Sequence, residues 1–202
     1  MGERQILPIV NEAPVVCSIN GTDPTLVMEV FLRRVKEAGF SGINNFPSIG
    51  MIDGNFRTAL EGTGMGYDKE VAVTALAHEM GFFTTAYAFT ADEARQMAEA
   101  GCDCLLAHVG LTVGGAIGAS ESMSMDEAAD KTREMADAAK AVNSDIMVLC
   151  HGGPISSPAD VEELLKRVPI DGFVGASSME RMPVEKGIRD RTAEFTAIKR
   201  PK

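Results

Sequence analysis

The chain has 202 residues, of which 45% are hydrophobic and 24% are charged, so its composition is that of a globular protein and excludes a disordered or fibrous chain. Its formal net charge is −10 and no run of basic residues is longer than Arg33-Arg34, so we expect no nucleic-acid partner. No apolar segment reaches the roughly eighteen residues of a membrane span, and residues 1–10 lack the ordered regions of a signal peptide. We therefore expect a cytoplasmic protein with no membrane partner, folded as one domain over residues 1–202.

The four cysteines lack the spacing of a zinc site. Cys102 and Cys104 are too close for an ordinary disulfide, while Cys17 and Cys150 each lie inside an apolar run. This pattern predicts reduced, buried thiols.

Two kinds of segment alternate along the chain. Short apolar or β-rich runs predict six strands, over residues 14–21, 42–50, 81–90, 102–110, 145–153 and 172–178. Segments with helical periodicity lie between most of them, over residues 23–40, 68–81, 90–101, 124–143 and 157–168. The alternation predicts an α/β fold with a parallel sheet, either doubly wound or a (β/α) barrel of the TIM type.

A TIM barrel has eight βα units in about 250 residues, and this chain has six predicted strands. Because residues 1–10 read like the end of a helix before the first strand, the two absent units would be the first two. The edges of the first and last strands would then be exposed, so either the natural protein is longer than this chain or a second chain closes the sheet. For the second case we expect a homo-oligomer.

Polar side chains and glycines follow the predicted strands, at the edge of the sheet where ligands bind in such folds. His108 and His151 each end an apolar run and would share one face, as a general acid/base pair or as one base and one electrophile. A structural role for either histidine is the alternative. His78 falls in the last turn of a predicted helix, where it suits the helix dipole.

The segments HGGPISSP and GASSMER are the strongest candidates for anion binding. Backbone N–H groups after the last two strands of a barrel often hold phosphate, and Gly152 and Gly153 would let the backbone approach a ligand. Ser177 and Ser178 would complete the cradle, while tight turns and helix caps are an equally good explanation of these glycines and serines. The glycine-rich segment GGAIG lacks the order of a dinucleotide site.

The connection over residues 46–70 is long and rich in glycine, as in a lid or substrate loop. Arg57 would be its anion ligand, with Asp53, Glu61 and Tyr67 as polar participants. The alternative is that the glycines only allow a long loop to fold on itself. Asn20 and Asn44, at the ends of the first two predicted strands, are further candidates for orienting a substrate.

The motifs GTDP, GFSGINNFPSIGMIDGNFRTALEGTGMGYDKEV, LAHVGLT, VLCHGGPI and GASSMER occur in this order. Together they resemble the TIM-barrel family called phosphoenolpyruvate hydrolase-like, which is similar to isocitrate lyase, phosphonopyruvate hydrolase and phosphoenolpyruvate mutase. The resemblance implies a hydrolase or lyase that binds a small oxo acid, or a phosphorylated or phosphono-carboxylic acid, and stabilises an enolate. It also implies that the first two βα units of the family are absent here.

The same resemblance suggests Mg²⁺ as a cofactor, but the carboxylates that hold Mg²⁺ in these relatives are not evident at the strand ends, which carry Asn20, Asn44, Asn45 and the histidines. We therefore assign no metal ligand. Two other hypotheses stay open: a regulatory module that binds a metabolite or nucleotide without turnover, and an inactive remnant of a barrel.

Overall fold

The structure is a computed structural model that describes residues 1–199. Its centre is a parallel sheet with the order β1-β2-β3-β4-β5-β6. The strands are β1 (Val16–Ser18), β2 (Gly42–Asn44), β3 (Phe83–Ala88), β4 (Cys104–His108), β5 (Met147–His151) and β6 (Gly172–Phe173). All six predicted strands are present, each shorter than predicted because the predicted ranges included flanking loop residues. Strands that pair in chain order are the arrangement of a TIM barrel, here with six of its eight strands.

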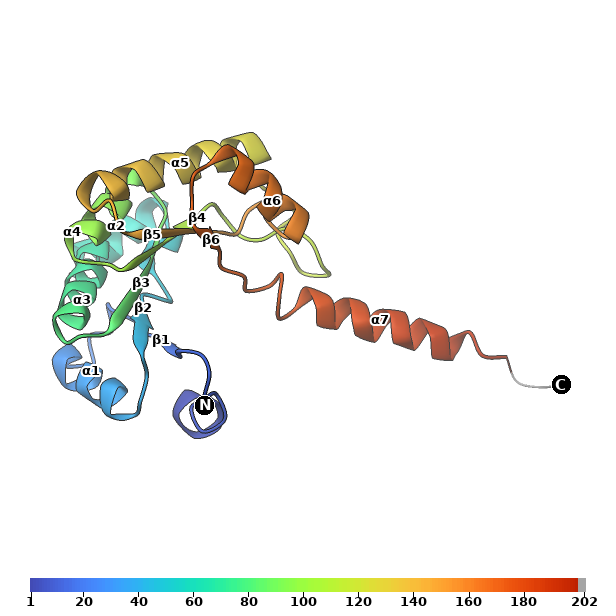
Figure 1. Cartoon of the computed structure of the whole chain (residues 1–202), viewed down its shortest axis with the longest axis horizontal. Helices are drawn as coiled ribbons and strands as arrows, with labels where there is room; N and C mark the ends of the chain where they lie inside the picture. The colour runs from blue at the N-terminus through green and yellow to red at the C-terminus, as the bar shows by residue number, and fades with distance from the viewer. Residues whose placement is uncertain (200–202) are drawn as a thin grey trace.

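Helices cover one side of this curved sheet (Figure 1). Those predicted from the sequence are α1 (Met28–Glu37), α3 (Tyr67–Glu79), α4 (Ala91–Glu99), α5 (Met125–Val142) and α6 (Pro158–Arg167). The predicted start of α1 at residue 23 was wrong by five residues, since the Asp23 carboxylate accepts the Thr25 N–H at 2.8 Å and forms a turn there.

The short helix η1 (Gly2–Ile6) lies where residues 1–10 were expected to end a helix. Three further elements were not predicted: η2 (Ile49–Met51), α2 (Gly54–Gly62) and α7 (Met182–Thr196). The last of these projects away from the sheet (Figure 1) and has no buried residue. Within residues 1–199, no helix is long and apolar enough to cross a membrane.

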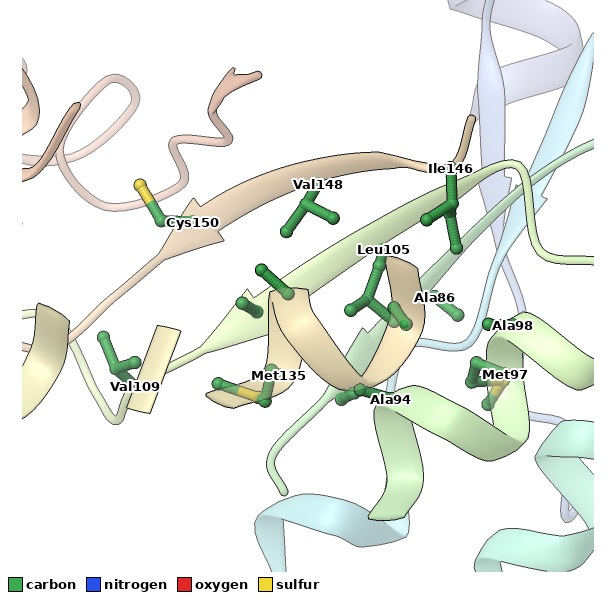
Figure 2. Close-up of a cluster of buried hydrophobic side chains, with 14 of the residues drawn as sticks. Ala86, Ala94, Met97, Ala98, Leu105, Val109, Met135, Ile146, Val148 and Cys150 are labelled. Atoms are coloured by element: carbon green, nitrogen blue, oxygen red, sulfur yellow. The ribbon is translucent and has the colours of Figure 1, made fainter. Parts of the chain in front are cut away.

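The main core lies between the sheet and helices α4, α5 and α6. Leu105 and Val148 are fully buried there and pack against Met97 and Met135 (Figure 2). Burying one such side chain contributes about 1.5–3 kcal/mol. Because side chains alternate along a strand, the strand residues between these core positions point to the opposite face of the sheet. The terminal histidines of β4 and β5 belong to that second set.

The cysteines are free thiols, as predicted. Cys102, Cys104 and Cys150 are buried, and burial raises the pKa of these thiols to about 12, about 11 and about 12, respectively. Cys17 is half-buried. A thiol with so high a pKa stays protonated near neutral pH, so the three buried cysteines act as packing residues.

Candidate active site

The structure brings His108 and His151 together at the carboxyl ends of two neighbouring strands. They are direct partners in the register of β4 and β5, and their ring centroids are 5.0 Å apart. Each residue is 8% exposed. Burial lowers the pKa of His108 to about 4, with a smaller contribution from His151, and burial also lowers the pKa of His151. Both rings are therefore neutral at pH 7.

Hydrogen bonds to the backbone assign a different tautomer to each ring. The Gly110 N–H donates to His108 Nδ1 at 3.1 Å, so in the neutral ring the proton of His108 lies on Nε2. The Nδ1 of His151 lies 2.8 Å from the Val174 carbonyl oxygen, which can only accept, so His151 carries its proton on Nδ1. The two Nε2 atoms are thus complementary, because that of His108 is a donor and that of His151 is an acceptor.

Two aromatic rings enclose the histidine pair. Tyr87 makes edge contacts with both rings, at centroid distances of 5.6 Å to His108 and 5.3 Å to His151. Phe89 packs on His108 at 4.8 Å. Tyr87 lies within the predicted strand 81–90 and was not expected at the site, because the sequence does not show on which face of the sheet its ring lies.

The two asparagines at the end of β2 form hydrogen bonds with neighbouring residues and do not face an open cavity. Asn44 is 6% exposed and donates to the Thr85 hydroxyl at 3.0 Å. Asn45 is 3% exposed and pairs with the backbone of Tyr87, accepting from its N–H at 2.7 Å and donating to its carbonyl at 3.1 Å. Asn44 therefore holds two strands together, and its predicted role in substrate orientation stays a prediction.

Asn20 and Arg57 are also engaged locally. Asn20 is exposed, and its side-chain oxygen accepts from the Thr22 N–H at 3.1 Å, which makes a turn after β1. The guanidinium of Arg57 forms ion pairs with Glu61 at 2.6 Å and Glu93 at 3.2 Å, and it donates to the Ile49 carbonyl at 3.0 Å. These bonds tie down the segment that the sequence suggested as a lid. Substrate binding by either residue stays a prediction.

Gly152 and Gly153 are required by a neighbouring loop. Both have positive φ, 83° and 56°, and a Cβ on Gly152 would lie 2.1 Å from the Gly110 carbonyl oxygen. The Gly153 N–H donates to that same oxygen at 2.8 Å. The close approach that we predicted for a ligand is thus made by the loop after β4, and the Gly153 N–H is not free for an anion.

The chain also supplies its own anion to the N-terminus of α6. The Asp160 carboxylate accepts from the N–H groups of Ser156 at 3.1 Å and Ser157 at 2.8 Å, and from both hydroxyls. Ser157 is the N-cap of α6 in a capping box with Asp160. Ser177 and Ser178 lie in the turn before α7, where the Ser177 carbonyl accepts from Met182 at 2.9 Å. The N–H groups of Gly153, Ser156 and Ser157 are therefore bonded within the chain, and anion binding by Gly152, Gly153, Ser177 and Ser178 stays a prediction.

A cavity of about 400 Å³ opens beside His108. Its lining combines the loops after β2, β3 and β4 with the start of α5, and it includes Asp53, Phe89, Leu111 and Lys131. Lys131 is the cation of this lining, and the ion pairs of the described residues do not include it. A cavity of this size suits a small metabolite. Lys131 was not singled out from the sequence, because an exposed lysine on a helix carries no distinguishing signal.

The residues at the strand ends do not fit Mg²⁺. A hard divalent cation needs several oxygen ligands, preferably carboxylates, whereas the strand ends carry Asn44, Tyr87, His108 and His151. Among residues 1–199, no group of three or more His, Cys, Asp or Glu side chains is placed to hold a metal ion. These residues are therefore not assigned as metal ligands.

Comparisons with known proteins agree with this fold. The tomato (Solanum lycopersicum) ToMV susceptible protein tm-1(GCR26) is 49% identical over 196 residues, which cover 96% of this chain and 26% of the tomato protein. A Sinorhizobium fredii protein named "Putative transcriptional regulatory protein y4pA" is 33% identical over 196 residues, which cover 97% of this chain and 32% of that protein. The chain thus spans only a quarter to a third of these relatives.

A solved Burkholderia cenocepacia structure described as a "putative lyase/mutase" superposes with a TM-score of 0.52 and 18% identity, over 91% of this chain and 62% of that chain. At this identity the likeness concerns the fold, and it supports the partial TIM barrel. The family model described as phosphoenolpyruvate hydrolase-like matches residues 1–198. This chain, a partial TIM barrel, belongs to the phosphoenolpyruvate hydrolase-like family.

Proposed function

We propose that this chain carries the active site of a lyase or hydrolase that acts on a small anionic oxo acid, or on a phosphorylated or phosphono-carboxylic acid. The observation that carries the proposal is the buried pair of neutral histidines with complementary Nε2 atoms. Family membership and the adjacent cavity support it.

In this proposal His151 and His108 divide the proton transfers. The Nε2 of His151 has a lone pair and takes a proton from the substrate, while the Nε2–H of His108 donates to an oxygen that becomes negative. A neutral imidazole is a suitable donor because it stabilises the developing charge without first having to be protonated. Lys131 binds the carboxylate or phosphate group of the substrate in the cavity.

Thermal unfolding in the presence of oxo acids, phosphoenolpyruvate and phosphonopyruvate tests the proposal, with product analysis of every compound that stabilises the protein. The substrate should stabilise the protein and be consumed. His151→Asn keeps a side-chain donor for the Val174 carbonyl but removes the basic nitrogen, so turnover should fall by about 100-fold or more while the fold persists. Unchanged turnover in the folded variant would exclude the role of His151.

A metabolite-binding regulatory function is the second candidate. The name of the Sinorhizobium fredii relative favours it, as does the absence of a carboxylate set at the strand ends within residues 1–199. The same experiment separates the two functions, because a regulatory ligand raises the melting temperature and is recovered unchanged.

A further inference from the structure

A buried carboxylate that the proposed chemistry does not use lies against the loop after β2. Glu70, in the first turns of α3, is 1% exposed. Its Oε2 accepts from Asn45 Nδ2 at 2.7 Å and from the Ser48 hydroxyl at 2.8 Å, and its Oε1 accepts from the Ile49 N–H at 2.7 Å. Burial raises the pKa of Glu70, and these bonds oppose that rise.

No basic side chain among the described residues pairs with Glu70. Lys69, the adjacent residue, is exposed and takes part in none of the ion pairs of the described residues, and those of Arg57 go to Glu61 and Glu93. Burying a carboxylate without a cation is costly, and an apolar side chain could hold the loop after β2 against α3 at lower cost. A carboxylate accepts hydrogen bonds and cannot donate them, so it fixes which atom of a neighbouring amide faces it.

Asn45 connects Glu70 to the backbone of Tyr87. Glu70 accepts from Nδ2 and so holds the amide of Asn45 in the orientation that its bonds to Tyr87 also need, with its oxygen facing the Tyr87 N–H at 2.7 Å. The same Nδ2 donates to the Tyr87 carbonyl at 3.1 Å, and the Tyr67 hydroxyl donates to that carbonyl at 2.6 Å. Both backbone groups of Tyr87 are therefore fixed at the point where its ring meets His108 and His151.

We propose that Glu70 is a positioning residue, which fixes the amide of Asn45 so that Asn45 holds the Tyr87 ring against His108 and His151. The inference rests on the proposed function only in assigning chemistry to the histidines. Its physical consequence is independent of that chemistry, because the Tyr87 ring keeps water from the histidine pair.

The test compares Glu70→Gln with Asn45→Asp and with the double variant. In Glu70→Gln, one carboxylate oxygen becomes an NH₂ group, which must face either Asn45 Nδ2 or the Ile49 N–H. In Asn45→Asp, a second acceptor faces the Glu70 carboxylate. The double variant restores one donor and one acceptor between the two positions and keeps the net charge, so it should recover part of what the single variants lose. Recovery is partial because the carboxylate introduced by Asn45→Asp cannot donate to the Tyr87 carbonyl, which then keeps only the Tyr67 hydroxyl as donor.

The first measurement is the pKa of the His108 ring by NMR titration. Loss of the Tyr87 contact admits water, so each single variant should raise this pKa from about 4 toward 6.5, and the double variant should lower it again. With a substrate in hand, kcat should fall by about tenfold to 100-fold in the single variants, with a smaller change in KM. Ser48→Ala is the matched control, because it removes a donor to Glu70 but has no contact with Tyr87 in the described hydrogen bonds.

A purely structural role predicts a different result. In that case Glu70→Gln and Asn45→Asp would lower the melting temperature, as Ser48→Ala should, while the His108 pKa stayed near its original value. That result would overturn the proposal. Tyr87→Leu covers the case in which the single variants do not fold, since it leaves Asn45 and Glu70 in place and must also raise the His108 pKa. Failure to find any substrate would count against the proposed function alone.

Discussion

Replacing His108 with Asn should make the stability of the protein less dependent on pH. Burial lowers the pKa of His108 from 6.5 to about 4, so the unfolded chain takes up a proton that the folded chain resists. Protonation therefore favours unfolding. The resulting loss of stability is small at pH 7, grows as the pH falls through 6.5, and is complete below about pH 4.

The size of the effect follows from the two pKa values. One pKa unit corresponds to 1.36 kcal/mol, so linkage gives a loss of about 2 kcal/mol at pH 5 and about 3 kcal/mol at pH 4. His108 is only 8% exposed, so solvent screening reduces this calculated loss of stability only slightly. The loss is a large fraction of the 5–15 kcal/mol that is typical of folded domains.

Urea unfolding of wild type and His108→Asn between pH 7 and pH 5 measures the effect. Asn keeps an acceptor for the Gly110 N–H, and carboxylates that titrate in both proteins cancel in the comparison. The variant should be less stable at pH 7 because it loses packing, and the gap should shrink by about 2 kcal/mol at pH 5. Leu106→Ala, on the same face of β4, is the control, because its gap should not change with pH. A gap for His108→Asn that is constant with pH would refute the buried, neutral histidine.

Three further outcomes are expected. Gly152→Ala should lower the free energy of unfolding by at least about 2 kcal/mol in urea titrations, because the φ of Gly152 is 83° and a Cβ there would clash with the Gly110 carbonyl. Gly187→Ala is the control: Gly187 lies on α7 with open space around it, so this variant should be more stable than wild type by about 0.5–1 kcal/mol. Lys131→Met should raise the KM of the substrate about tenfold in steady-state assays, whereas Lys166→Met, on the exposed side of α6, should not. Asp160→Ala should cost about 1 kcal/mol in thermal unfolding, and added phosphate should recover part of that loss by occupying the freed N–H groups.

The architecture could be predicted because its signals are local. Each buried strand is a short apolar run, and the helices α4 to α6 carry side-chain N-caps and one apolar face. The elements that were missed lack these signals. Helix α7 contains Pro183 and Gly187 and buries no residue, so it has no apolar periodicity that reflects packing. Helix α2 lies in a segment whose glycines indicated a loop.

The candidate site could be predicted only where its residues end strands. His108 and His151 were found because the carboxyl ends of parallel strands meet, whatever the details of packing. Asn45 and Glu70 lie 25 residues apart and meet through the path of the loop after β2, which the sequence does not reveal. Lys131 reaches the cavity from a helix face that looks like any solvated face. Such residues become visible only with a three-dimensional structure.

The predicted anion cradle stays a prediction, because its glycines and serines fit two explanations equally well in sequence. Glycines with positive φ allow the backbone to approach a ligand or another loop, and in HGGP the partner is the loop after β4. The serines of ISSP can hold an anion or cap a helix. Here the sequence did contain a deciding signal, since Asp160 stands three residues after Ser157 in the spacing of a capping box. A carboxylate already placed at a helix N-terminus competes with any external anion, so the proposed function assigns the substrate's anionic group to Lys131, which lines the cavity beside His108.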